Sequence, residues 1–219
     1  MNEESHPTAR RTFVGAVAAG AAALAAGRWS DANAETLVTL PPSDAWVARI
    51  KGKHKQVFDL TTPNDGFGPV FGLTFLETAG EAHKLTAKDL TAVLVFRHFA
   101  MPLVVNDAVW AKYKVGELLG VKDPKTNAPA TRNVFYNNVP LHPGLTYEQL
   151  AAQDGIVVVA CNKALTVVSG MAGEKVGIKA DQAKKDWEAG LFKGVTLALS
   201  GVYAVNRAQE AGCTYCNAG

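Results

Sequence analysis

Gly155-Ile-Val-Val-Val-Ala-Cys161 is the stretch that decides the fold of this 219-residue chain. Its unbroken apolar run is typical of a strand that is covered on both faces of a parallel sheet. Thr91–Phe96 is a second run of this kind, Lys55–Leu60 predicts a first strand, and Val195–Leu199 predicts a last core strand. The chain therefore carries strands that suit the centre of a sheet, each well separated from the next along the sequence.

Helical segments separate these strands. Pro69 suits the first position of a helix, because its missing N–H is not needed there, and Asn106 can cap a helix from Asp107 to Leu119 that Gly120 ends. Further helices are expected around Thr146–Gln153, over Asn162–Met171 and Ala180–Ala189, and from a Ser200 cap to Ala211. Strands that alternate with helices predict an α/β domain with a parallel, doubly wound sheet in a three-layer sandwich.

Residues 1–34 have the pattern of a twin-arginine export signal. Arg10 and Arg11 stand just before the apolar stretch Val14–Gly27, and Ala32-Asn33-Ala34 offers the small residues that a signal peptidase reads. We expect cleavage before Glu35, which places the mature protein in a periplasm or outside the cell. The alternative is an N-terminal membrane anchor, but the apolar stretch is short and rich in Ala and Gly.

The remaining residues, 35–219, are expected to form one domain. They number about 185 (219 minus 34), within the usual range of about 100–200 residues per domain. Residues 121–143 are rich in Pro, Asn and Thr and predict an inserted loop, which at that length is usually functional or mobile.

The charge and hydropathy patterns exclude some partners. The formal net charge of the chain is +2, and removing residues 1–34 leaves it unchanged. No basic run with interleaved aromatic residues is present, so nucleic acid is not an expected partner. No second apolar segment is long enough for a stable membrane span after cleavage.

Candidate functional residues stand at the carboxyl ends of the predicted strands, where ligands gather in parallel sheets. Arg97 and His98 follow the second strand, and Cys161 follows the third. A cysteine between a strand and a helix meets unpaired amides and the positive end of the helix dipole, which favour a reactive thiolate. The alternative is that Cys161 is a small buried residue, that His98 ends a strand as a satisfied hydrogen-bonding group, and that Arg97 pairs with an acid.

Cys213-Thr-Tyr-Cys216 is a second candidate for redox chemistry. It is not a haem-attachment motif, because Asn217 stands where the histidine is needed. A thioredoxin-like dithiol opens a helix, whereas this pair follows one, and no second cysteine pair completes a zinc site. Two interpretations remain: a disulfide formed passively in an oxidising compartment, or a dithiol that exchanges with Cys161.

A nucleotide cofactor is not expected either. Gly66-Phe-Gly-Pro-Val-Phe-Gly72 has one residue too many between its second and third glycines for a dinucleotide loop, and Pro69 removes an amide that a phosphate needs. No cofactor and no metal are therefore assigned to the chain from its sequence.

The chain resembles the DsrE/DsrF-like proteins of sulfur relay over most of its predicted mature part. The likeness rests on the Lys55–Leu60 strand, the strand that ends at Arg97-His98, the Gly155–Cys161 strand with its cysteine, and the Val195–Gly212 segment with Tyr215. The resemblance implies a small α/β protein that assembles into trimers or hexamers. It further implies that Cys161 carries sulfur as a persulfide with His98 as a neighbour.

Three features depart from typical members of that family: the export signal, the 121–143 insertion, and the Cys213/Cys216 pair. By the resemblance, the expected partners are a sulfur donor or acceptor protein or a small sulfur compound, with Cys213/Cys216 resolving the adduct. The alternatives are a protein that binds a metal or redox cofactor through Cys161, His98 and the tail pair, and an oligomeric subunit without chemistry of its own.

Overall fold

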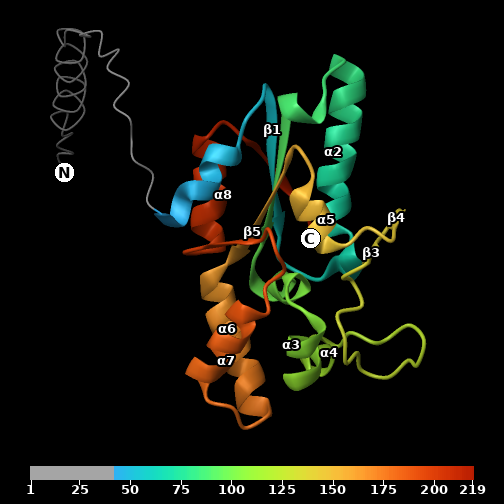
Figure 1. Ribbon diagram of the computed structural model, residues 1–219, viewed down its shortest axis with the longest axis vertical. Helices are drawn as coiled ribbons and strands as arrows, with labels where there is room; N and C mark the ends of the chain where they lie inside the picture. Colours follow the sequence, from blue (N-terminus) through green and yellow to red (C-terminus); the bar gives the residue numbers. More distant parts are fainter. Residues whose placement is uncertain (1–41) are drawn as a thin grey trace, which may run out of the picture. The chain divides into compact units, whose positions relative to one another are not determined.

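The computed structural model describes residues 42–219 (Figure 1). The predicted export signal, with Arg10, Arg11 and Ala32-Asn33-Ala34, lies outside the described residues. Within residues 42–219, no helix is both long and apolar enough to cross a membrane.

A five-stranded sheet with every strand parallel forms the centre of the fold. Its spatial order is β6-β5-β2-β1-β7, in which the strands are β1 (His54–Leu60), β2 (Leu90–Phe96), β5 (Ile156–Cys161), β6 (Thr196–Ala198) and β7 (Thr214–Asn217). Every residue of β2 and β5 is buried. The prediction of an α/β fold with a parallel sheet is therefore confirmed, and its two apolar runs lie side by side at the centre.

The outermost strand β7 was not predicted. The strand predicted at Val195–Leu199 is present as β6. Thr214–Asn217 follows it in the chain and pairs in parallel with β1 at the opposite edge, where Cys216 lies beside Phe58. The sequence does not predict β7, because this strand is short, polar and mostly exposed and lacks the apolar run that identifies a central strand.

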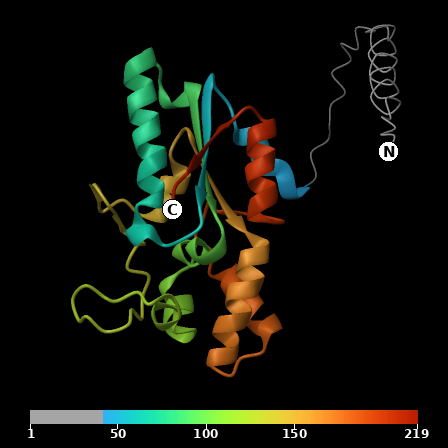
Figure 2. The ribbon, with the colours of Figure 1, turned by 180° about the vertical axis from the view of Figure 1, so that it is seen from behind.

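Helices cover both faces of the sheet (Figures 1 and 2). One face packs against α2 (Gly68–His83) and α5 (Tyr147–Ala152). A Cβ on Gly72 would lie 2.7 Å from Leu94 Cδ2, so this glycine lets α2 approach β2 closely. The other face packs against η1 (Pro42–Arg49) and α8 (Gly201–Glu210), whose Trp46, Ala204 and Ala208 contact the valines of β1, β2 and β5.

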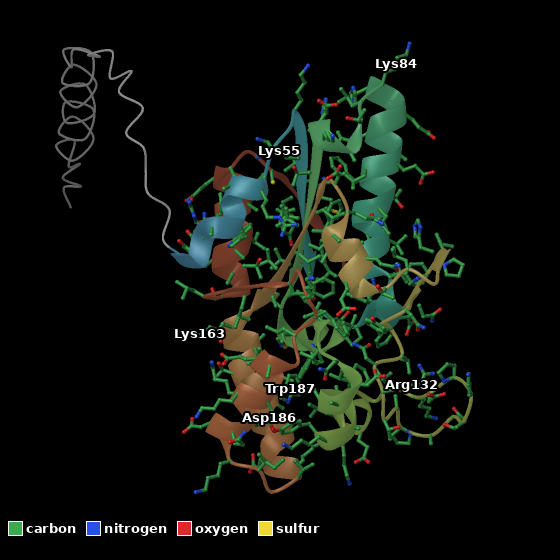
Figure 3. All side chains as sticks on the ribbon, in the orientation of Figure 1. Lys55, Lys84, Arg132, Lys163, Asp186 and Trp187 are labelled. Carbon is green, nitrogen blue, oxygen red and sulfur yellow. The ribbon has the colours of Figure 1, made fainter. Side chains whose placement is uncertain are left out.

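The short helices η2 (Asn64–Gly66) and η3 (Ala87–Asp89) follow β1 and precede β2, respectively. Five further helices lie beyond the carboxyl ends of β2 and β5: η4 (His98–Val104), α3 (Asp107–Lys112), α4 (Val115–Leu119), α6 (Asn162–Lys175) and α7 (Ala180–Ala189). Helix α7 has the predicted bounds, and α6 runs one turn further than expected. Asp186 on α7 accepts hydrogen bonds from Lys112 Nζ and the Tyr113 hydroxyl, both at 2.5 Å, next to the buried Trp187 (Figure 3).

The single helix predicted from Asp107 to Leu119 is two helices. Lys114 adopts a left-handed conformation (φ 49°) between α3 and α4 and breaks the helix there. This break directs Gly116 against the backbone of Ala130, where a Cβ would lie 2.3 Å from the carbonyl oxygen. Packing against a distant segment therefore overrides the helical propensity of the local sequence.

The predicted insertion, residues 121–143, is mostly irregular and contains the short strands β3 (Asn138–Val139) and β4 (His142–Pro143). The buried Asn133 anchors it, because its side-chain amide donates hydrogen bonds to the carbonyls of Leu103 and Val105 at 2.8 and 2.9 Å. Arg132 pairs with Asp123 at 3.0 Å within the insertion. The middle of the loop is thus bound to the domain.

Candidate functional site

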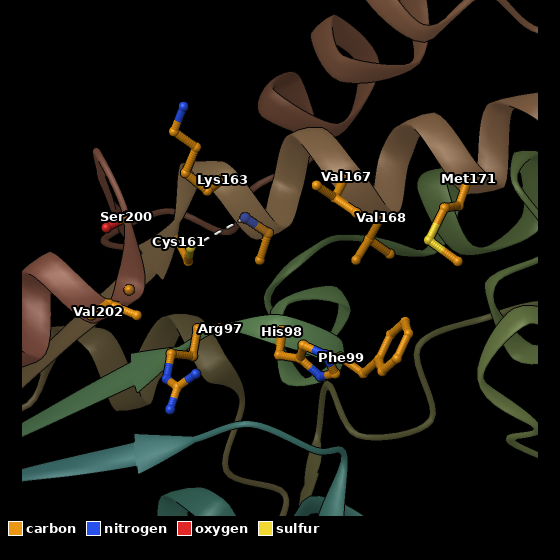
Figure 4. A pocket seen from close by; sticks show the side chains of 12 residues that line it. Arg97, His98, Phe99, Cys161, Lys163, Val167, Val168, Met171, Ser200 and Val202 are labelled. Carbon is orange, nitrogen blue, oxygen red and sulfur yellow. Dashed lines mark hydrogen bonds between the residues drawn. The ribbon is translucent and has the colours of Figure 1, made fainter.

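Cys161 is the last residue of β5 and the N-cap of α6 (Figure 4). Strand and helix join without an intervening loop, so the thiol lies where the sheet ends and the helix amides begin. Its Sγ accepts the backbone N–H of Ala164 at 3.2 Å, as the side-chain oxygen of a serine does at a helix start. Cys161 as a whole is only 5% exposed to solvent. The junction predicted from the sequence is present, with the cysteine inside it.

Cys161 borders a cavity of about 380 Å³. The cavity lies between the first turns of α6, the residues that follow β2, and the start of α8. Its lining consists of Arg97, His98, Phe99, Cys161, Lys163, Ala164, Val167, Val168, Met171, Ser200, Gly201 and Val202. The structure therefore brings three predicted site residues, Arg97, His98 and Cys161, to one cavity at the carboxyl end of the sheet.

Gly201 is a site residue that was not singled out from the sequence. It is the first residue of α8, directly after the Ser200 cap, whose hydroxyl accepts the Tyr203 N–H at 3.1 Å. A Cβ on Gly201 would lie 2.5 Å from Arg97 Cβ and 3.1 Å from Cys161 Cβ. A glycine is thus needed for α8 to begin against the cysteine. The available signal was the Ser-Gly pair at the predicted start of the final helix.

Arg97 is held by an acid on the neighbouring strand. Its Nε and Nη2 donate to the two carboxylate oxygens of Asp59 at 2.5 and 2.8 Å, and the Tyr215 hydroxyl donates to the same carboxylate at 3.0 Å. The hydrogen bonds to Asp59 raise the pKa of Arg97. Its guanidinium points away from Cys161 (Figure 4). The cation is therefore neutralised within the chain and contributes its stem, more than its charge, to the cavity.

His98 lies across the cavity from α6. Its backbone adopts a left-handed conformation (φ 51°), which is uncommon for a residue with a side chain. The imidazole packs edge-on against Phe99, with ring centroids 4.5 Å apart. Among residues 42–219, no hydrogen bond joins His98 to Cys161. The two side chains line the same cavity but do not bond to each other.

The tail cysteines lie far from this cavity and point to opposite faces of the sheet. Cys213 packs with the cluster on the α8 face, whereas Cys216 packs against the cluster on the α2 face. Side chains three residues apart on an extended strand point in opposite directions. All three cysteines are free thiols. In this structure the two thiols are not bonded to each other and lie on opposite faces of the sheet.

Exchange between Cys161 and the tail pair within one chain is not supported by the topology. Strands β2 and β1 separate β5 from β7, and three strand spacings amount to about 14 Å. Burial raises the pKa of the Cys213 thiol to about 11, which makes it a poor nucleophile. Within the described residues, Cys213 and Cys216 pack against the two faces of the sheet.

A metal site is not visible in the described part of the chain, where no three His, Cys, Asp or Glu side chains lie close enough to hold an ion. Cys161, His98 and the tail pair in particular do not converge.

Comparisons of the chain with the known protein families, with curated proteins and with solved structures each returned no match.

Proposed function

We propose that the protein is a DsrE-like thiol or persulfide carrier that uses Cys161 as its acceptor. The observation that carries this proposal is the position of the thiol. It ends a central strand, caps α6, accepts the amide of Ala164, and borders a cavity with room for a small molecule. In this position, a backbone N–H donates a hydrogen bond to the sulfur of Cys161, and the cavity gives a substrate access to it. Sulfur exchange requires both.

The proposed reaction is a thiol–disulfide type exchange. The Cys161 thiolate attacks the outer sulfur of a donor persulfide or polysulfide, the S–S bond of the donor breaks, and the shortened donor leaves as a thiolate with the electron pair. Cys161 is then a persulfide. The sulfur is delivered by the reverse reaction. An acceptor thiolate attacks the outer sulfur of the persulfide, and Cys161 leaves as a thiolate. No external oxidant or reductant is consumed.

The other lining residues take supporting roles in this proposal. His98 exchanges a proton with the leaving or entering sulfur across the cavity. Arg97, anchored by Asp59, is a positioning residue that fixes the wall next to Cys161. The tail thiols Cys213 and Cys216 play no part in the exchange within one chain, because β1 and β2 lie between them and Cys161.

The finer fold type, partners and location belong to the same proposal. The doubly wound three-layer arrangement of DsrE type fits a sheet with helices on both faces. We propose assembly into a trimer or hexamer, as the resemblance implies. Export by the twin-arginine route to a periplasm follows from the sequence of residues 1–34. The partner is a sulfur donor or acceptor protein or a small sulfur compound.

The test is sulfur transfer to the reduced protein, followed by intact mass and peptide mapping. Incubation with an alkyl persulfide or with polysulfide should add one sulfur atom to the peptide that holds Cys161, and cyanide should remove it. Cys161→Ser should abolish the addition, whereas Cys216→Ser, on the far strand, should leave it intact. The proposal fails if no adduct forms, or if the Cys161→Ser protein gains sulfur as readily as the wild type.

A further inference from the structure

The walls of the Cys161 cavity are almost entirely apolar. Phe99 closes one side, and Val167, Val168 and Met171 extend along α6 on the other, with Val202 at the start of α8 (Figure 4). Its volume of about 380 Å³ lies within the usual range of about 300–1,000 Å³ for small-molecule sites. The cavity can therefore enclose a compact organic group next to the thiol.

The charged side chains at the cavity point away from it. Nε and Nη2 of Arg97 donate to Asp59, and the guanidinium points away from Cys161 (Figure 4). Lys163 is exposed, and its side chain runs away from the space between α6 and residues 97–99 (Figure 4). An inorganic anion that enters would lose water and find no cationic group directed into the cavity, which is costly.

We infer that the substrate of this site is an organosulfur compound with a compact apolar body, such as an alkyl or aryl persulfide, and not an inorganic sulfur anion. This inference rests on the proposed function of Cys161 as the sulfur acceptor. The apolar body packs between Phe99 and the α6 side chains, and its sulfur meets the Cys161 thiol. Each methylene group that the bound compound buries raises its affinity for the cavity by about fourfold.

Methanethiosulfonates that share one leaving group test the inference without invoking sulfane sulfur. The Cys161 thiolate attacks the sulfenyl sulfur of R–S–SO2CH3, the S–S bond breaks, and methanesulfinate leaves with the electron pair. Cys161 becomes the mixed disulfide Cys161–S–S–R. The thiolate is oxidised to the disulfide level and the sulfonyl sulfur is reduced to sulfinate, so the step balances.

The experiment compares the full chain with four reagents whose R group is benzyl, methyl, 2-sulfonatoethyl or 2-trimethylammonioethyl. The rate of modification at Cys161 is followed by peptide mapping and divided by the rate of each reagent with a short cysteine peptide. We expect the benzyl reagent to exceed the methyl one by about tenfold or more, given several buried carbons. The sulfonatoethyl reagent should fall below the methyl one. Equal normalised rates, or a preference for the sulfonate, would overturn the inference.

Charged variants at the mouth of the cavity sharpen the test. Met171→Lys places an ammonium group on the α6 wall, where the residue is 43% exposed. It should lower the benzyl rate and raise the sulfonatoethyl rate, and Val167→Lys, at 61% exposure, should do the same. Leu141→Lys is the matched control, because Leu141 is 78% exposed and outside the cavity lining. Unchanged selectivity in both α6 variants would contradict the inference.

The two proposals fail in distinguishable ways. If Cys161 prefers the benzyl reagent but takes no sulfur from polysulfide or from benzyl persulfide, the cavity inference stands and the carrier function is wrong. If Cys161 accepts sulfur from thiosulfate, with release of sulfite, and shows no apolar preference, the function stands and the inference is overturned.

Discussion

Replacing Asp59 by Asn tests the ion pair that holds Arg97 away from Cys161. Asp59 is 4% exposed, and its two carboxylate oxygens accept hydrogen bonds from Nε and Nη2 of Arg97. Asparagine keeps the shape of the side chain and removes its charge. One acceptor oxygen becomes an NH2 group, which faces the guanidinium donors and cannot bond to them.

The expected loss of stability follows from this geometry. Removing one partner of a buried ion pair costs about 3–5 kcal/mol. The Arg97 side chain is 29% exposed, so water can solvate part of its released charge. We therefore expect Asp59→Asn to lower the free energy of unfolding by about 2–3 kcal/mol, measured by urea denaturation. The freed guanidinium can also turn toward the cavity, which should raise the rate of the sulfonatoethyl reagent at Cys161.

A double-mutant cycle separates the pair from a general effect of the substitution. Arg97→Gln removes the cation, and the double variant with Asp59→Asn should cost less than the sum of the two single variants. Asp154→Asn is the matched control, because Asp154 is exposed and should change stability by no more than about 0.5 kcal/mol. The reasoning is refuted if Asp59→Asn behaves like that control and the cycle shows no coupling.

Three further predictions concern other parts of the domain. Gly201→Ala should lower the free energy of unfolding by about 1–3 kcal/mol, because the new Cβ would lie 2.5 Å from Arg97 Cβ. Gly170→Ala is the control and should not lower it, because its Cβ would meet only Ala180 at 3.9 Å. Urea denaturation of both variants measures the difference. Hydrogen bonds from Lys112, Tyr113 and Gln182 lower the pKa of Asp186 to about 2, so the stability that this carboxylate contributes is present above about pH 4 and is lost as pH falls toward 2. Asp186→Asn should flatten that part of the stability profile measured by urea denaturation at each pH. Thiol counting at pH 8 should find Cys213 unreactive until the chain is unfolded, and a mild oxidant should not join it to Cys216; a Cys213–Cys216 disulfide in the folded protein would contradict the β7 register.

The sequence predicts the centre of this fold well, because burial leaves a local signature there. The apolar runs in β2 and β5 follow from strands covered on both faces, and the position of Cys161 between strand and helix follows from the same run. What could not be predicted depends on contacts between distant segments. Asp59 is 38 residues from Arg97 and 156 from Tyr215, and neither spacing marks them as partners.

Elements at the edges escaped prediction for a related reason. Strand β7 owes its conformation to pairing with β1 and carries no apolar pattern of its own. The break between α3 and α4 at Lys114 depends on the packing of Gly116 against Ala130, and the sequence pattern of residues 107–119 does not contain that contact. The Cys213/Cys216 spacing suggests paired thiols in a turn or helix, but an extended backbone separates them.

Strand β7 also sets the order in which a newly made chain can complete its sheet. Strand β1 is synthesised early, yet its outer partner begins at Thr214, and Gln56 and Thr214 are 158 residues apart. Until residues 214–217 emerge from the ribosome, one edge of β1 presents unpaired amides and carbonyls that other chains can bind. A pairing of such long range also slows folding. The domain therefore completes its sheet only after nearly all of these residues have been translated, and a ribosome stalled before residue 214 releases a chain prone to aggregation.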